Sequence, residues 1–344
     1  MNTPHAQTIA AIRRQRGASL VIMGHHYQGG LVIQHTDLRG DSLELARQVR
    51  GLRAARHIVF CGVSFMAETA AMLAAPGQKV VSPAPEAGCV MADMAPGPLA
   101  DAVLRRLTAD GRRIIPLAYV NTDAHVKAVV ARHGGSVCTS ANAPAMLRWA
   151  LERGDGVLFL PDKNLGHNTA NILGLREDRR AVIDVSGMGA ALDPAALRSK
   201  TLLLWPGMCV VHKRFTAAQV EAVRHRDPDA LVVVHPECEP EVVGRADAAG
   251  STSFIIRYVA EAPRGAAIYV GTELNLVERL AREHEGVRTV RPLTPSHCRN
   301  MAKTTEEVLA ATLEDLDDIE PVTVPCDVAR DAVVAIERML EACR

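Results

Sequence analysis

The stretch Leu202-Leu-Leu-Trp-Pro-Gly-Met-Cys-Val-Val-His212 joins an apolar run to a sharp turn and then to two side chains that can bind a metal. The leucines predict a buried strand. The Pro206-Gly207 pair predicts that this strand ends abruptly and that its backbone comes close to a neighbouring segment. Cys209 and His212 follow the turn, and both side chains suit a transition metal. For one isolated cysteine, the simpler interpretation is a small buried side chain after an ordinary turn.

Cys209 is not isolated, because Gly88-Cys89 and His297-Cys298 occupy similar loops in the first and last thirds of the chain. The two intervals between these cysteines nearly match once the weakly patterned residues 173–200, interpreted as an insertion or surface excursion, are left out. This spacing is consistent with three similar αβ units that each bring one thiol to a common axis. Three thiolates would suit a [4Fe-4S] cluster, which usually takes four cysteines, and one iron would then stay open as a Lewis acid.

The other cysteines fit such a site less well. The chain has eight cysteines and no C-x-x-C pair, so we expect free thiols rather than a disulfide framework. Cys61, Cys138 and Cys238 lie at strand ends and remain possible ligands, whereas Cys326 and Cys343 in the terminal helix fit packing or surface positions.

Composition indicates a small-molecule partner. The 344 residues include 39 Lys and Arg and 39 Asp and Glu without a run of like charge, so we expect no binding to nucleic acid or to an anionic membrane surface. No stretch approaches the roughly 20 apolar residues needed to span a bilayer, and residues 1–16 lack the apolar segment of a signal peptide. The sequence therefore predicts a cytoplasmic protein.

Short apolar runs alternate with helical patterns along the whole chain, which predicts an α/β fold with parallel sheets covered by helices. We expect three pseudo-symmetric αβα domains with short parallel sheets around a central iron-sulfur site. Their expected limits are residues 1–88, residues 89–208 with the insertion 173–200, and residues 209–298, with the helices of 299–344 packed on the first. Nearly every strand ends in a polar turn, and ligands bind at that edge of open parallel sheets.

Several of these turns carry candidate catalytic or binding groups. His235 and Glu237 are two residues apart on an extended segment, so both could point to one side as an acid and a base, although a capped turn with a solvated Glu explains them equally well. Tyr119 and Asn121 could bind a small oxygenated ligand. Hydroxyls that precede helices could hold a carboxylate or phosphate, although N-capping is the simpler explanation for each: Ser42, Ser140, Ser251 and Thr252.

A series of motifs, read in order from about residue 20 to 305, resembles the quinolinate synthase family. The motifs are Gly24-His-His-Tyr-Gln28, Gly40-Asp-Ser-Leu43, Phe60-Cys-Gly-Val63, Phe65-Met-Ala-Glu68, Ala87-Gly-Cys89, Met91-Ala-Asp93, Tyr119-Val-Asn121, Cys138-Thr-Ser-Ala-Asn142, Phe159-Leu-Pro-Asp162, Trp205-Pro-Gly207, Cys209, His235-Pro-Glu-Cys238, Gly250-Ser-Thr252, Gly271-Thr-Glu273, Cys298 and Met301. The whole series is far more specific than any one motif.

The resemblance implies a [4Fe-4S] cluster held by Cys89, Cys209 and Cys298. It implies that iminoaspartate, supplied by an aspartate-oxidising enzyme, condenses with dihydroxyacetone phosphate, loses phosphate and water, and closes to quinolinate in NAD biosynthesis. Glu237 would be the main general base, and Tyr27 would assist isomerisation and ring closure. The remaining implied site residues position groups, relay protons or hold carboxylates and phosphate: His25, His212, His235, Ser42, Tyr119, Asn121, Ser140, Ser251 and Thr252.

The chain departs from the family pattern in two ways. It has the insertion 173–200 together with the tail beyond Asp317, and it lacks a C-x-x-C-x-x-C run around Cys298. Without that run, the thiol switch suggested for some longer members should not operate here. Two other functions stay open at this point. One is an iron-sulfur hydro-lyase acting on a small hydroxy acid, and the other is a non-catalytic sensor that carries a cluster.

Overall fold

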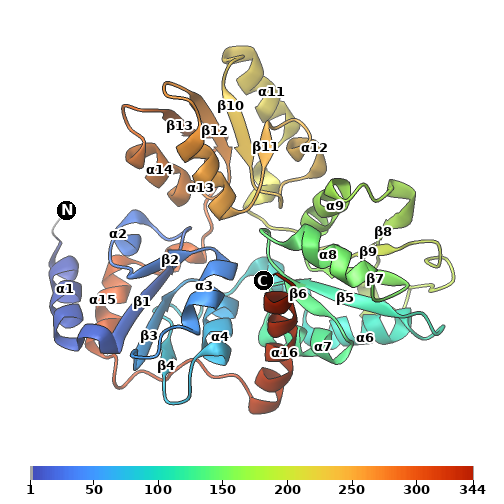
Figure 1. The fold of residues 1–344 in the computed structure, drawn as a ribbon, viewed down its shortest axis with the longest axis horizontal. Helices are drawn as coiled ribbons and strands as arrows, with labels where there is room; N and C mark the ends of the chain where they lie inside the picture. Colours follow the sequence, from blue (N-terminus) through green and yellow to red (C-terminus); the bar gives the residue numbers. More distant parts are fainter. Residues whose placement is uncertain (1–2, 344) are drawn as a thin grey trace.

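The computed structural model describes residues 3–343 and contains three parallel sheets, one in each lobe of the molecule (Figure 1). The first sheet has the order β2-β1-β3-β4 and the third has the order β11-β10-β12-β13. Their strands are β1 Leu20–His25, β2 Leu38–Gly40, β3 His57–Cys61, β4 Lys79–Val81, β10 Leu231–Val234, β11 Ala248–Ala249, β12 Ala267–Gly271 and β13 Thr289–Pro292. Every strand pair is parallel, which confirms the predicted α/β class.

The second sheet repeats this topology with one additional strand. Its order is β6-β5-β7-β9-β8, so removing β8 leaves the same arrangement as in the other two sheets. Its strands are β5 Ile114–Tyr119, β6 Ser136–Cys138, β7 Gly156–Leu160, β8 Arg180–Val182 and β9 Leu202–Leu204. The stretch 173–200 therefore extends the sheet by an edge strand instead of forming only a surface excursion.

Helices cover both faces of each sheet, so the central strands are continuous apolar runs. Every residue of β3, β5, β7 and β9 is buried. The helices are α1 Pro4–Arg16, α2 Gly30–Ile33, α3 Ser42–Val49, α4 Ser64–Leu73, α5 Val90–Asp93, α6 Gly97–Leu107, α7 Ala124–Arg132, α8 Ala143–Leu151, α9 Lys163–Ile172, α10 Ser186–Gly189, α11 Ala217–Arg226, α12 Pro240–Val243, α13 Thr252–Glu261, α14 Leu274–Glu283, α15 Glu306–Glu314 and α16 Cys326–Ala342, with 3-10 turns that include η3 His212–Arg214 and η4 Met301–Lys303.

The apolar core is distributed unevenly among the lobes. One large cluster runs from the first lobe into the second and includes Phe65, Met91 and Trp205. The third lobe has two clusters of its own, one on each face of its sheet. The first and second lobes therefore share a core, whereas the third is packed mainly within itself.

The two C-terminal helices pack on different lobes. Helix α15 lies against α1 and α2 in the first lobe, whereas α16 lies mainly against α7 and β6 of the second lobe (Figure 1). The prediction that both helices cover the first domain is wrong for α16. The reason is its buried stripe, Ala332, Ala335, Ile336 and Met339, whose small residues allow close approach to α7. The expected domain limits at residues 88, 208 and 298 stay predictions. None of the helices within residues 3–343 is long and apolar enough to cross a membrane.

The turn after β9 has the close backbone approach that Pro206-Gly207 predicts. A Cβ atom added to Gly207 would lie 2.5 Å from the carbonyl oxygen of Pro161. The carbonyl oxygen of Gly207 also accepts a hydrogen bond from the backbone N–H of Lys163 at 3.0 Å. Trp205, fully buried beside this turn, donates from Nε1 to the Met94 carbonyl at 2.8 Å. The path of the chain toward Cys209 is therefore fixed on both sides of the glycine.

We expect Gly207→Ala to lower the free energy of unfolding by roughly 1–3 kcal/mol, because the new methyl group would meet rigid backbone rather than a flexible side chain. Chemical denaturation of the two proteins measures this difference. Gly29→Ala is the matched control, because Gly29 has φ −56° and nothing within 4 Å of its added Cβ. Equal stability of the Gly207→Ala variant and the wild type would show that the approach to Pro161 is not tight.

Candidate active site

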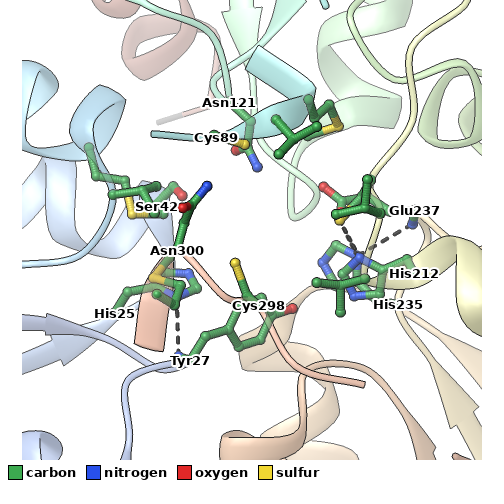
Figure 2. A pocket seen from close by; sticks show the side chains of 18 of the residues that line it. His25, Tyr27, Ser42, Cys89, Asn121, His212, His235, Glu237, Cys298 and Asn300 are labelled. Carbon is green, nitrogen blue, oxygen red and sulfur yellow. Dashed lines mark hydrogen bonds and ion pairs between the residues drawn. The ribbon is translucent and has the colours of Figure 1, made fainter. Parts of the chain in front are cut away.

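A cavity of about 470 Å³ lies where the three lobes meet. Its wall contains strand ends and loops from all three lobes, together with the segment 297–301 (Figure 2). The predicted site residues that line it are His25, Tyr27, Ser42, Cys89, Tyr119, Asn121, Ser140, Cys209, His212, His235, Glu237, Thr252 and Cys298. Ser251 does not line it. That side chain is the N-cap of α13, and its hydroxyl accepts a hydrogen bond from the Phe254 N–H at 3.3 Å.

Three half-buried cysteines from separate parts of the chain share this cavity: Cys89, Cys209 and Cys298. Figure 2 shows Cys89 and Cys298 on the same open space. Burial raises the pKa of all three thiols, that of Cys89 to about 12, so they are neutral in the metal-free protein and would lose protons on binding a metal. The other five cysteines lie outside the wall of this cavity.

Buried carboxylates hold two of these loops. Asp162 caps α9 through the N–H groups of Asn164 and Leu165, and its second oxygen accepts the N–H of Cys209 at 3.2 Å. Glu273 accepts the N–H of Cys298 at 3.3 Å. Each loop is therefore fixed through its backbone, which leaves the thiol free to bind.

Glu237 is buried beside two imidazoles. Its Oε2 lies 2.5 Å from Nδ1 of His212 and 3.5 Å from Nδ1 of His235, and the two rings stack with centroids 4.4 Å apart. Burial, the largest single cause, would raise the pKa of Glu237, but His212, His235 and Tyr119 together outweigh it and the pKa falls to about 2. Glu237 is therefore ionised at neutral pH. Its loop is held from the second lobe, where Asn168 Nδ2 donates to the carbonyls of Pro236 and Cys238 at 2.8 Å each.

A chain of hydrogen bonds connects Glu237 with Tyr27 on another wall of the cavity. Nε2 of His212 lies 3.1 Å from Oγ1 of Thr272, and the same oxygen lies 2.8 Å from the Tyr27 hydroxyl. Thr252 donates to that hydroxyl at 3.3 Å. These contacts lead from Glu237 through His212 and Thr272 to Tyr27. A proton can therefore pass between Glu237 and Tyr27, which are far apart in the sequence.

Thr272 was not among the predicted site residues, although it lies in the motif Gly271-Thr-Glu273. Thr272 follows β12 directly and is fully buried. Because polar residues at the ends of parallel strands face the ligand, its position could have been used to predict Thr272 as a site residue. Only the structure shows that its hydroxyl lies between His212 and Tyr27.

Comparison with known proteins identifies the family. A family model described as quinolinate synthetase A protein matches residues 7–341. Quinolinate synthase of Bacillus pumilus is 44% identical over 340 residues, which cover 97% of this chain and 92% of the relative. The chain belongs to the quinolinate synthase family. The Bacillus subtilis enzyme is 42% identical over 338 residues, covering 96% of this chain and 91% of the relative. The Corynebacterium glutamicum enzyme is 43% identical over 331 residues, covering 94% and 84%.

Membership in the quinolinate synthase family confirms the resemblance seen in the motifs and makes the protein an enzyme of NAD biosynthesis. The family is iron-sulfur dependent, and the donor atoms here suit that chemistry. Three thiols line one cavity, and one of them belongs to a group with metal-binding spacing, in which ligand atoms of Cys209, His212 and Glu237 lie within 4.8 Å of one another.

Two histidines of the cavity wall are neutral at physiological pH. Burial, the largest cause, lowers the pKa of His25 and of His235 to about 3. The Nδ1 atom of His25 accepts the backbone N–H of Tyr27 at 3.2 Å, and its ring meets the Tyr27 ring edge-on with centroids 4.7 Å apart. A neutral imidazole of such low pKa is a poor base, so these rings are better suited to hydrogen bonding and positioning.

The helix ends at the cavity provide neutral hydroxyls. Ser42 is the first residue of α3, whose next N–H groups already donate to the capping carboxylate of Asp41 at 3.0 Å. The Ser42 hydroxyl is therefore the group available to a ligand, rather than the helix end itself. Asp41 also accepts from Ser253 of α13 at 2.9 Å, which joins the first and third lobes beside the cavity.

We expect Thr272→Val to lower kcat about tenfold or more, because it removes the hydroxyl between His212 and Tyr27 without changing the side-chain volume greatly. Steady-state kinetics of quinolinate formation measures this effect. Thr272→Ser keeps the hydroxyl and should retain most of the rate. If the valine and serine variants are equally active, the hydrogen-bonded chain does not carry protons.

Proposed function

We propose that the protein condenses iminoaspartate with dihydroxyacetone phosphate in this cavity and releases quinolinate, phosphate and water. The observation that carries the proposal is the position of the Glu237-to-Tyr27 chain beside three thiols in one cavity. Iminoaspartate is the two-electron oxidation product of aspartate, so an aspartate-oxidising enzyme is the expected supplier.

We propose Cys89, Cys209 and Cys298 as the ligands of a [4Fe-4S] cluster. Their common cavity and the backbone anchoring of two of their loops support this assignment. A cluster held by three cysteines supplies one iron without a protein ligand, which can act as a Lewis acid.

Glu237 is the general base and Tyr27 is the acid at the far end of the chain. Oε2 of Glu237 lies 2.5 Å from Nδ1 of His212, so a proton that the carboxylate takes from carbon or nitrogen of the substrate can pass to the imidazole. Burial raises the pKa of Tyr27 well above its ordinary value, so its hydroxyl stays protonated and can donate a hydrogen bond. His212, between them, can accept a proton at one ring nitrogen and release one at the other.

Neutral polar groups would position the substrates. Asn121 has a buried Oδ1 without a hydrogen-bond partner among the described residues, so this oxygen can accept a hydrogen bond from a ligand N–H or O–H. We assign carboxylate and phosphate binding to the hydroxyls and rings of His25, Ser42, Tyr119, Ser140, His235 and Thr252, with Asn121. Ser251 would act through its position at the start of α13.

The test is an anaerobic assay of the protein after cluster reconstitution. Both substrates together should give quinolinate and inorganic phosphate, and leaving out either substrate should give neither product. A small hydroxy acid alone, the substrate expected of a hydro-lyase, should not be dehydrated. A cluster-loaded protein that makes no quinolinate from both substrates would refute the proposal.

A further inference from the structure

The wall of the cavity within residues 3–343 contains just two arginines and no lysine. Arg214 ends the η3 turn that begins with His212, and Arg299 follows Cys298 directly. Both side chains are exposed. In the described part of the chain, neither guanidinium forms an ion pair or a side-chain hydrogen bond, although many other arginines do. Two unpaired cations therefore lie on the exposed part of the wall.

Apart from these two arginines, no arginine or lysine among the described residues lines the cavity. The proposed substrates carry two carboxylates and one phosphate. Fixed charges of one sign at the mouth of a low-dielectric cleft raise the rate at which oppositely charged ligands enter. Guanidinium groups also match carboxylate and phosphate geometry through paired hydrogen bonds.

We propose that Arg214 and Arg299 form a cationic gate that captures the anionic substrates at the mouth of the cavity. The inference rests on the proposed function for the identity of the anions. Because both arginines are exposed, they can bind an anion without the cost of a buried unpaired charge and then release it to the neutral donors inside.

The experiment compares Arg214→Gln, Arg299→Gln and the double variant in the cluster-loaded protein. Lys213→Gln is the matched control, because Lys213 is exposed, carries the same charge beside Arg214 and does not line the cavity. At low salt, the double variant should lose about tenfold or more in kcat/KM for both substrates, with kcat within about twofold. The wild-type kcat/KM should fall as salt rises, and that of the double variant should change little. Lys213→Gln should match the wild type.

Calorimetry measures the binding of quinolinate, of inorganic phosphate and of uncharged nicotinamide. These binding measurements test the gate separately from the reaction. If the wild type makes no quinolinate but binds the two anions through the arginines, the proposed function fails and the gate stands. If the wild type makes quinolinate and the double variant keeps its kcat/KM and salt dependence, the gate is refuted. An equal loss in Lys213→Gln would also refute it, because net charge alone would then explain the effect.

Discussion

Exchanging Cys209 for serine is expected to reduce bound iron and sulfide to near zero and to abolish quinolinate formation. Serine has nearly the same shape, so the fold should persist, but its hydroxyl cannot replace a thiolate as a ligand for iron and sulfide clusters. Because the three proposed ligands come from separate loops, we expect that the remaining two cannot hold the cluster. Anaerobic iron and sulfide content, with the visible absorption spectrum, measures the result.

Cys326→Ser is the control for this experiment, because Cys326 is exposed at the start of α16. That variant should keep full iron content and activity. Serine at Cys89 or Cys298 should repeat the loss seen at Cys209. Four irons per chain in the Cys209→Ser protein would contradict the ligand assignment and direct attention to Cys61, Cys138 and Cys238, which are buried outside the cavity.

Replacing Glu237 with glutamine is expected to lower kcat by about 10²–10⁴-fold while leaving iron and sulfide unchanged. The amide keeps the size of the side chain but cannot accept a proton, and it cannot pair with His212 as a carboxylate at 2.5 Å does. Single-turnover kinetics with measured cluster content separates loss of chemistry from loss of cofactor.

Glu239→Gln is the matched control for this carboxylate, because Glu239 is exposed only two residues away, at the start of α12. Its rate should stay within about twofold of the wild type, as expected for a surface substitution. The lowered pKa of Glu237 means that its carboxylate should remain ionised as the pH falls from 8 to 5, so no loss of rate over this range should arise from its protonation. Full turnover by a cluster-loaded Glu237→Gln protein would exclude this residue as the base.

Local sequence pattern predicted most of the fold and the membership of the site. Short runs of Val, Ile and Leu between helical patterns establish parallel strands, because such strands are buried on both faces. The polar residues after these strands predicted the wall of the cavity, because parallel strands bring their carboxyl ends to one edge. The recurrence of Cys89, Cys209 and Cys298 in similar loops predicted a shared location, and the structure puts all three on one cavity.

The sequence by itself determined the fold class, the close turn at Gly207 and the chemistry available at each strand end, because these depend on neighbouring residues and on periodicity. Only the tertiary structure decided which distant groups meet: Thr272 between His212 and Tyr27, α16 against α7, and Arg214 and Arg299 at one cavity. Those contacts join residues from different lobes or loops. No local periodicity encodes them, because they arise from how three independently patterned units pack around a common centre.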